Sequence, residues 1–444
     1  MSFTEDIISK IEDNSLVVGV VGLGYVGLPL ATAFAKRFKV IGFDTWVERV
    51  EMLRHGISYI DDVKEVGNGK FNPTTDVGKL AECDVIIIAV PTPLHENKRP
   101  DLKPVKSASE SVGRILRKGQ LVVLESTTYP GTTEEIMLPT LEEFSGLKVL
   151  EDFGVAYSPE RIDPGNKTYS VTTTPKIVGG LTPEWTEVTA KVYGAVITNI
   201  FKVSDCKTAE MVKIYENVFR NVNIALVNEM ALISERMGID MWEVIEAAKT
   251  KPYGFMAFYP GPGVGGHCIP LDPYYLAYRS RQFDYIPQFI ETSGEVNDYM
   301  PVHVVNLAKK GLEKVGKRIH EANIAVLGIA YKENVTDTRE SPAVPIIEEL
   351  IDRGSIVKVY DPLAKSIRIE GAILESKGSI EEVLQWADCA ILLTAHAKLR
   401  EQLRAVMPTM ERTDFVFVDT RNVIREKVDG YRGIMVKLGS TKER

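Results

Sequence analysis

One cysteine stands in a glycine-rich segment that leaves few side chains to surround it. Cys268 lies between Gly261 and Pro270, a stretch with four glycines, and Asp272 follows it by four positions. Glycine permits positive φ and close approach of a substrate, whereas a packing cysteine normally has apolar neighbours on a helix or strand. The pattern predicts a nucleophilic thiolate with a carboxylate in reach, but it does not by itself identify the reaction.

A second chemically informative segment lies near the N-terminus. The motif GLGYVG follows an apolar run at 16–21, and we expect a helix at 28–38 and a strand at 39–43 that ends at Asp44. This is the dinucleotide-binding fingerprint, whose glycines permit a tight turn against the pyrophosphate at a helix N-terminus. Asp44 would bind the ribose hydroxyls and repel a 2′-phosphate, which favours NAD. The predicted NAD contacts here are Gly22, Gly24, Tyr25, Val26, Gly27, Asp44 and Arg49.

Composition excludes several classes of protein. The chain has 444 residues, is 44% hydrophobic and carries a net charge of −8, which predicts two or three domains and no nucleic-acid partner. The uncharged stretch 16–35 is long enough to span a bilayer, but acidic residues precede it and glycines interrupt it, so we expect a soluble, cytoplasmic protein. Four scattered cysteines and six dispersed histidines predict neither a disulfide framework nor a metal site.

The pattern of strands that must position these residues is repeated along the chain. Residues 387–396 repeat the pattern of 82–93, and the runs 323–330 and 356–362 ahead of the second copy resemble two strands of another mononucleotide-binding half. The expected fold class is therefore α/β, with two Rossmann-like doubly wound domains. Because the second domain lacks GxGxxG, its ligand should be a different nucleotide.

A long helix is predicted between the two domains, over residues 206–237. It contains no glycine or proline, and at roughly 45 Å it would join domains or form a dimer interface. Lys213 and Asn217 lie four residues apart on one face. From these residues alone, a solvated surface lysine is the favoured interpretation.

Several segments resemble the UDP-glucose/GDP-mannose dehydrogenase family over about residues 10–430. They read VGLGYVGLPLA, VPTP, ESTTYPGTT, SPERIDPGN, AEMVKIYENVFR, GPGVGGHCIPLDP and GIAYKENVTDTRESP. The resemblance implies an NAD-binding domain at 1–205, a central helical dimerisation domain with the cysteine segment at 206–305, and a UDP-sugar-binding domain at 306–444. A homodimer or higher homo-oligomer is expected.

The resemblance also implies a reaction, the four-electron oxidation of a sugar C6 alcohol to a carboxylate with two NAD⁺. Cys268 would add to the intermediate aldehyde, since an aldehyde needs a nucleophile before it can lose a second hydride. Lys213 and Asn217 match the family's oxyanion site, which replaces the surface-lysine interpretation. Asp272 and Thr127 match positions that hold water or transfer protons, and Glu160 is a further acid/base candidate.

Other matching positions imply binding roles. Pro91, Thr92, Ser126 and Thr127 end parallel strands, where α/β sheets place their ligands, and with Arg339 they are expected at the NAD site. The residues expected at the UDP-sugar are Glu160, Arg161, Lys213, Asn217, Gly265, Gly266 and Lys332.

The sugar is suggested by departures from the UDP-glucose enzymes. Those enzymes usually have a lysine before the Ser-Thr pair, where this chain has Glu125, and a Pro-Glu-Phe-Leu segment, where this chain has Arg161 after Glu160. These differences resemble the branch acting on UDP-N-acetylhexosamines, and Arg161 could contact the acetamido group. UDP-N-acetylglucosamine is the first choice, ahead of the mannosamine and galactosamine analogues and UDP-glucose. A one-step alcohol or 2-hydroxy-acid dehydrogenase and a non-catalytic nucleotide-sugar binder remain alternatives from other classes.

Overall fold

The computed structural model describes residues 2–60, 63–66, 69–95, 98–163, 166, 168–425 and 428–441. Two compact units account for the packing, one formed by Met1–Asn217 with Leu271–Ile286 and the other by Val218–Pro270 with Pro287–Arg444. Each unit has its own sheet and its own hydrophobic core. The division into domains at 1–205, 206–305 and 306–444 stays a prediction.

The first unit is built on an eight-stranded sheet with the order β3-β2-β1-β4-β5-β6-β7-β8. Only the β6–β7 pair is antiparallel. The order 3-2-1-4-5-6 is that of the doubly wound dinucleotide-binding fold, and the strands predicted at 16–21 and 39–43 are confirmed. The strands are β1 (Val17–Val21), β2 (Lys39–Phe43), β3 (Phe71–Thr74), β4 (Val85–Ile88), β5 (Leu121–Leu124), β6 (Gly154–Tyr157), β7 (Lys176–Gly180) and β8 (Ile200–Lys202).

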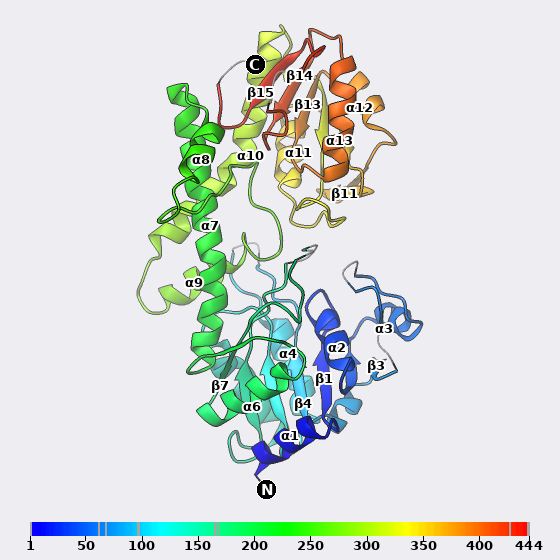
Figure 1. Ribbon diagram of the computed structural model, residues 1–444, viewed down its shortest axis with the longest axis vertical. Helices are drawn as coiled ribbons and strands as arrows, with labels where there is room; N and C mark the ends of the chain where they lie inside the picture. Colours follow the sequence, from blue (N-terminus) through cyan, green and yellow to red (C-terminus); the bar gives the residue numbers. More distant parts are fainter. Residues whose placement is uncertain are drawn as a thin grey trace. The chain divides into compact units, whose positions relative to one another are not determined.

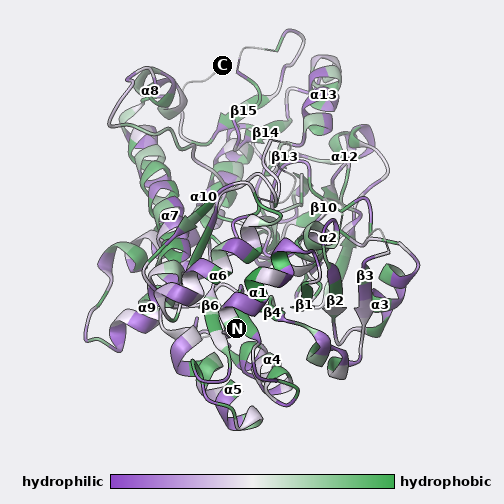
Figure 2. Ribbon diagram, turned by 60° about the horizontal axis from the view of Figure 1, so that its bottom comes forward, coloured by the Kyte–Doolittle hydropathy of each residue, from purple (hydrophilic) through white to green (hydrophobic). Residues whose placement is uncertain are grey.

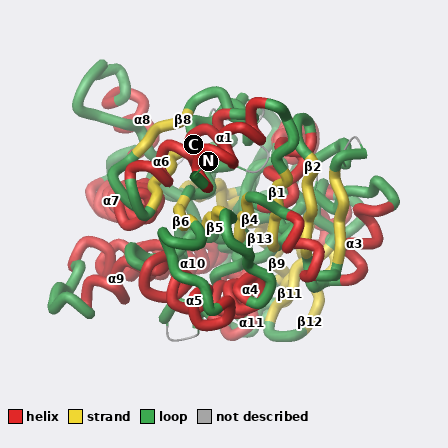
Figure 3. Tube along the Cα trace, turned by 90° about the horizontal axis from the view of Figure 1, so that it is seen from below, coloured by secondary structure: helices red, strands yellow, loops and turns green. Residues whose placement is uncertain are grey.

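Helices cover both faces of this sheet because its strands are apolar on both sides. In β4, Val85 and Ile87 join one core cluster while Ile86 and Ile88 join the other. α1 and α6 lie over one face and α4 and α5 over the opposite face (Figures 1 and 3). The helical elements are α1 (Phe3–Glu12), α2 (Gly27–Ala35), α3 (Val47–Arg54), η1 (Val77–Glu82), α4 (Lys103–Gly113), η2 (Thr133–Met137), α5 (Leu138–Ser145), α6 (Pro183–Gly194) and α9 (Asp272–Arg281).

One predicted helix is shorter than expected. α2 ends at Ala35, whereas residues 28–38 were expected to be helical. The amides of Lys36 and Arg37 donate to carbonyls three residues earlier, at Ala33 and Phe34. This tighter turn lets the chain reverse and enter β2 at Lys39.

The second unit contains a fully parallel five-stranded sheet with the order β10-β9-β13-β14-β15. It confirms the second Rossmann-like domain, and the strand order reverses between β9 and β13, where such sheets place ligands. The strands are β9 (Asn323–Leu327), β10 (Ile356–Tyr360), β13 (Cys389–Leu392), β14 (Val416–Asp419) and β15 (Ile434–Lys437), with a separate hairpin of β11 (Ser366–Ile369) and β12 (Ala372–Glu375). The helical elements are α8 (Met241–Ala248), α10 (Gln288–Lys314), α11 (Ala343–Asp352), α12 (Ile380–Trp386), α13 (Ala397–Val406) and η3 (Met407–Thr409).

α7 (Cys206–Met237) has the predicted bounds and 32 residues. It carries hydrophilic and hydrophobic residues along its whole length (Figure 2). Among the described residues, no helix combines the length and hydropathy needed to cross a membrane.

The internal repeat extends beyond the strands into the loops. Gly22 and Gly328 have φ of 90° and 79°, and each donates its amide to the last carbonyl of the next strand, Phe43 or Tyr360, at 2.8 Å. The following amide donates to Asp44 in the first unit and to Asp361 in the second. The surroundings of the two acids differ, because Asp361 also lies 3.0 Å from Nε2 of the buried His396.

Candidate active site

The glycine turn after β1 shows which glycines the fold requires. A Cβ on Gly22 would lie 2.5 Å from the carbonyl oxygen of Ala89, and one on Gly27 would lie 1.8 Å from that of Gly22. Gly24 has no atom within 4 Å of its Cβ position. Packing within the protein explains the first and third glycines, whereas open space at the second is what close approach of a pyrophosphate needs.

Asp44 directly follows β2 beside this turn, as predicted. Its carboxylate accepts hydrogen bonds from the amides of Leu23 and Trp46, both at 2.9 Å. The Arg49 guanidinium lies 3.9 Å from the carboxylate and over the Trp46 ring, 4.2 Å from its centroid. The turn, the acid and the parallel strand ends therefore fit a bound NAD.

Two further loops end at the same edge of the sheet. Ser126, after β5, donates its hydroxyl to the Val90 carbonyl, after β4, at 2.7 Å. The Thr92 carbonyl accepts a bond from the buried Tyr275 hydroxyl of α9. Pro91 is exposed and Thr127 is half-buried. The predicted residues of both loops thus lie at the carboxyl edge, where a dinucleotide contacts this fold.

Three predicted catalytic residues lie close together in the first unit. Lys213, Asn217 and Asp272 are 6%, 5% and 3% exposed. The Asn217 amide donates to the Asp272 carboxylate. Burial raises the pKa of Asp272 to about 7, although the Lys213 charge and the Asn217 bond oppose that rise. The surface-lysine interpretation of Lys213 is therefore wrong, and a buried cation stands beside a carboxyl group that can exchange protons near neutral pH.

Glu210 was not singled out from the sequence. It lies on the same side of α7 as Asn217, is fully buried, and accepts bonds from the Thr133 amide at 2.9 Å and hydroxyl at 2.7 Å. The Gly131 amide also donates to it, and burial raises its pKa to about 7. Glu210 thus holds the segment that follows Thr127. In the sequence of a helix with mixed polar and apolar residues, a glutamate would be expected to face solvent, so Glu210 could not be recognised as buried.

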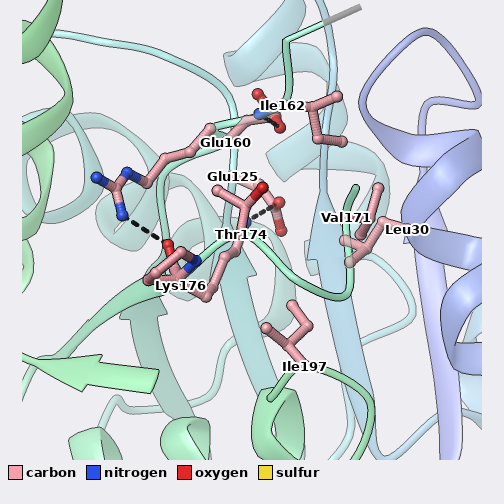
Figure 4. A pocket seen from close by; sticks show the side chains of 10 residues that line it. Leu30, Glu125, Glu160, Ile162, Val171, Thr174, Lys176 and Ile197 are labelled. Carbon is pink, nitrogen blue, oxygen red and sulfur yellow. Dashed lines mark hydrogen bonds and ion pairs between the residues drawn. The ribbon is translucent and has the colours of Figure 1, made fainter. Parts of the chain in front are cut away.

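Glu160 and Arg161 line a narrow cavity of about 10 Å³ (Figure 4). Lys176 and Glu125 also line this cavity and form a buried ion pair, and Glu125 accepts a further bond from Tyr193 at 2.7 Å. Burial raises the pKa of Glu125. Arg161 pairs with Glu216 of α7 at 2.6 Å and donates to the Pro175 carbonyl at 2.6 Å. Its contact with a sugar stays a prediction, and Glu216 is a partner that the sequence did not indicate.

The cysteine segment lies in the second unit. Cys268 is exposed, whereas Cys83, Cys206 and Cys389 are buried, and burial raises the pKa of Cys83 to about 12. Only Cys268 therefore has the access that a nucleophilic thiol needs.

The glycines of this segment pack against the loop that carries Lys332. Gly266 has φ of 97° and donates its amide to the Glu340 carbonyl at 3.0 Å. A Cβ on Gly265 would lie 2.7 Å from Pro342. Lys332 is half-buried in that loop. The structure thus brings Gly265 and Gly266 to the loop after β9, at the switch point of the second sheet.

Arg339 lies in the same loop with its side chain exposed. Its guanidinium pairs with Asp337 at 2.6 Å, and His267, beside Cys268, lies 3.3 Å from the same carboxylate. These partners hold the pKa of Asp337 well below its usual range. The predicted NAD contact of Arg339 stays a prediction.

Arg421 is a further residue that the sequence alone did not indicate. It follows β14 and donates from Nε to the Leu393 carbonyl, just after β13, at 2.7 Å. A Cβ on Gly261 would lie 2.8 Å from Nη1 of Arg421. This arginine therefore lies between the carboxyl edge of the second sheet and the start of the cysteine segment. From the sequence it would be expected to be an ordinary charged residue of a turn.

Comparison with known proteins agrees with this arrangement. The UDP-glucose/GDP-mannose dehydrogenase family models match residues 16–197 (NAD binding domain), 207–299 (central domain) and 325–426 (UDP binding domain). UDP-N-acetyl-D-glucosamine 6-dehydrogenase of Pseudomonas aeruginosa is 45% identical over 79% of this chain and 83% of that protein. UDP-N-acetyl-D-mannosamine dehydrogenase of Pyrococcus horikoshii is 36% identical over 94% of this chain and 98% of that protein.

A solved structure of the UDP-D-ManNAc dehydrogenase from Pyrococcus horikoshii covers 96% of this chain and 99% of its own, with a TM-score of 0.87 and 34% identity. A UDP-glucose dehydrogenase structure from Pyrobaculum islandicum matches with a TM-score of 0.83 and 27% identity, over 96% and 98% of the two chains. The chain therefore belongs to the UDP-glucose/GDP-mannose dehydrogenase family and is an NAD-dependent nucleotide-sugar dehydrogenase.

Proposed function

We propose that the protein oxidises the C6 hydroxyl of a UDP-N-acetylhexosamine to a carboxylate, with UDP-N-acetylglucosamine as the first-choice substrate. This proposal depends on the buried group of Lys213, Asn217 and Asp272 beside the dinucleotide-binding sheet. The same chain has an exposed thiol, Cys268, in a glycine segment that packs against the loop after β9 of the second sheet. The relatives from Pseudomonas aeruginosa and Pyrococcus horikoshii are named as dehydrogenases of N-acetylhexosamine nucleotides, which favours this substrate class. The product would serve the synthesis of surface polysaccharide precursors.

The proposed mechanism assigns each step to a residue. The turn from Gly22 to Gly27 and Asp44 would hold NAD⁺, which when bound supplies the hydride acceptor for both oxidations. The Cys268 thiolate adds to the C6 aldehyde, and the thiohemiacetal loses the second hydride to become a thioester. Water cleaves the thioester, so that one alcohol, two NAD⁺ and one water give a carboxylate, two NADH and three protons.

The buried polar group would stabilise charge and move protons. The ammonium of Lys213 and the amide of Asn217 are suited to an alkoxide that develops in a dry site. Asp272, with a pKa of about 7, can accept a proton and return it at neutral pH. Thr127 would hold the water, and Glu160, which is also buried, is the second acid/base candidate.

A panel of UDP-sugars tests the proposal. With NAD⁺ and UDP-N-acetylglucosamine, we expect two NADH for each sugar consumed, followed as absorbance at 340 nm. The mannosamine and galactosamine analogues and UDP-glucose should react with lower kcat/KM. One NADH per sugar would instead support a one-step alcohol dehydrogenase, and binding without NADH would support a nucleotide-sugar sensor.

Arg161→Leu is expected to reduce the preference for the N-acetyl sugar. Loss of a charged hydrogen-bond donor beside the acetamido group should lower the ratio of kcat/KM for UDP-N-acetylglucosamine over UDP-glucose by about 10-fold or more. Glu216→Gln is the matched control, because it retains the arginine but removes its ion-pair partner. An unchanged ratio in the leucine variant would refute a role of Arg161 in sugar choice.

Self-association is supported by an exposed apolar stripe along α7. Its spacing follows the helical period, which places its members on one side. We expect a homodimer, and Leu226→Lys should shift the sedimentation coefficient toward that of a monomer, whereas Ser107→Lys on α4 should not. A dimer that survives the Leu226 change would contradict this interface. The stripe consists of Met211, Tyr215, Phe219, Leu226, Met230, Ile233 and Met237.

A further inference from the structure

We propose that Asn221 and Asn228 are positioning residues that hold the two ends of the Cys268 segment. This inference rests on the proposed thiol mechanism, and it assigns a purpose to a buried polar network that the mechanism does not use. Both asparagines lie on α7, seven residues apart, and they are 4% and 0% exposed. Seven residues are close to two helical turns, so the two side chains face the same way about 10 Å apart along the helix.

Each asparagine makes one hydrogen bond to the backbone of the segment. The side-chain oxygen of Asn228 accepts from the Gly261 amide at 3.0 Å. The side-chain amide of Asn221 donates to the Ile269 carbonyl at 3.1 Å. Gly261 begins the glycine segment and Ile269 directly follows Cys268, so the two bonds bracket the nucleophile.

A second layer of bonds fixes the two amides. Ser293 of α10 donates its hydroxyl to the Asn221 side-chain oxygen at 2.8 Å. Asn228 donates to the side-chain oxygen of Asn297 at 3.0 Å, and Asn297 donates to the Asn221 carbonyl at 3.3 Å. All four side chains are buried. Because both polar groups of Asn221 and of Asn228 have partners, neither amide can rotate without losing a bond in a buried site.

The segment needs such support because its own residues restrain it weakly. Gly263 and Gly266 adopt φ of 139° and 97°, and glycine has the widest choice of backbone conformations. A thiol that must meet an aldehyde within near-attack distance loses about 10²-fold in rate for a displacement of about 1 Å. If the contact between α7, α10 and the Cys268 segment served packing alone, apolar side chains would suffice, and they carry no desolvation cost.

The variants Asn221→Asp and Asn228→Asp keep the side-chain shape and each remove one hydrogen bond. One bond lost is to the Cys268 segment and the other is to the surrounding network of buried side chains. Asn221→Asp retains the acceptor for Ser293 but cannot donate to Ile269. Asn228→Asp retains the acceptor for Gly261 but cannot donate to Asn297. Each variant adds one buried carboxyl group to the same helix, so the cost of burial is matched. Asn223→Ala on α7 is the control for changes to the helix surface, because the Asn223 amide donates to the Phe219 carbonyl of the same helix.

The measurements are single-turnover NADH release with UDP-N-acetylglucosamine, the rate of Cys268 alkylation by iodoacetamide, and the affinities for UDP and NAD⁺. We expect Asn221→Asp to release the first NADH at the normal rate and the second about 10²-fold more slowly, with a changed alkylation rate and unchanged affinities. Asn228→Asp should slow the second step less, and Asn223→Ala not at all. If Asn221→Asp unfolds, Asn221→Ser provides the same readouts.

Two results would overturn the inference. One is equal slowing in both aspartate variants, which would assign the effect to the network; the other is a normal second step in a folded Asn221 variant. Cys268→Ser, assayed in parallel, distinguishes failure of the mechanism itself. Two NADH per sugar from Cys268→Ser would refute the thiol mechanism, whereas a stalled Cys268→Ser beside a normal Asn221→Asp would refute only the positioning role.

Discussion

Cys268→Ser is expected to release one NADH per sugar and then to stall. A serine hydroxyl stays protonated at neutral pH and is a much weaker nucleophile than a thiolate, so the aldehyde gains no oxygen-bearing adduct from which a second hydride could leave. Formation of the acid should fall by up to about 10⁶-fold, the scale of loss when a covalent nucleophile is removed. The affinities for NAD⁺ and UDP should remain, because both nucleotide folds keep their contacts.

Rapid-quench sampling with mass spectrometry measures this outcome directly. The serine variant should accumulate a bound aldehyde-level species, whereas the wild type should pass through a thioester on Cys268. Cys206→Ser is the matched control, since that buried thiol donates to the Gly179 carbonyl at 3.4 Å and a hydroxyl can replace it. Acid formation at the normal rate in the Cys268 variant would rule out the thioester route.

Asp272→Asn is expected to remove the acidic limb of the pH–rate profile. Burial raises the pKa of Asp272 to about 7, and a base must be ionised to accept a proton. The wild-type kcat should therefore rise with pH through about 7 and level off above it. The asparagine variant should show a flat profile and a rate about 10²- to 10⁴-fold lower. Glu210→Gln is the control, because Glu210 has a similar pKa but its carboxylate accepts hydrogen bonds from the amides of Gly131 and Thr133. Loss of the acidic limb in both variants would contradict the assignment to Asp272.

Asp272→Asn should also change how the free energy of unfolding depends on pH. The direction of the change follows from the difference between the pKa of Asp272 in the folded and the unfolded protein. The pKa of Asp272 in the folded protein lies above its ordinary value of 3.8, so folding favours the neutral form. That contribution is fully present below about pH 4 and is lost as the pH rises through about 7. The free energy of unfolding of Asp272→Asn should depend less on pH in this window than that of the wild type, as denaturant titrations can measure.

Much of the fold could be predicted because its elements are locally coded. The strands at 17–21 and 39–43 are continuous apolar runs, the glycine turn and its acid keep a set spacing, and α7 runs uninterrupted because no proline or glycine breaks it. The repeat of strand patterns was enough to indicate two doubly wound sheets. These features depend on neighbours within a few residues, and the fingerprint carries its chemistry in the same short stretch.

α7 shows where local reasoning ends. Its exposed side carries seven large apolar residues, and its buried side carries Glu210, Lys213, Asn217, Asn221 and Asn228. Ile214, Val227 and Ala231 of this helix are buried as the usual rule expects, but the rule that apolar residues face inward and polar residues outward fails for these two sets. The polar side chains are buried because segments distant in sequence supply their partners, at 131–133, 261–269 and 272.

The two nucleotide-binding sheets, the NAD turn with its acid, the long helix and the one cysteine set among glycines can all be predicted from the residues that form them. The burial of Lys213 beside Asp272, the pairing of Arg161 with Glu216, and the bonds of Glu210 and two asparagines to backbone segments become visible in the folded protein. Burial and hydrogen-bond partners arise from packing between segments that are distant in sequence. A strand, a turn or a helix, by contrast, follows from the residues that compose it.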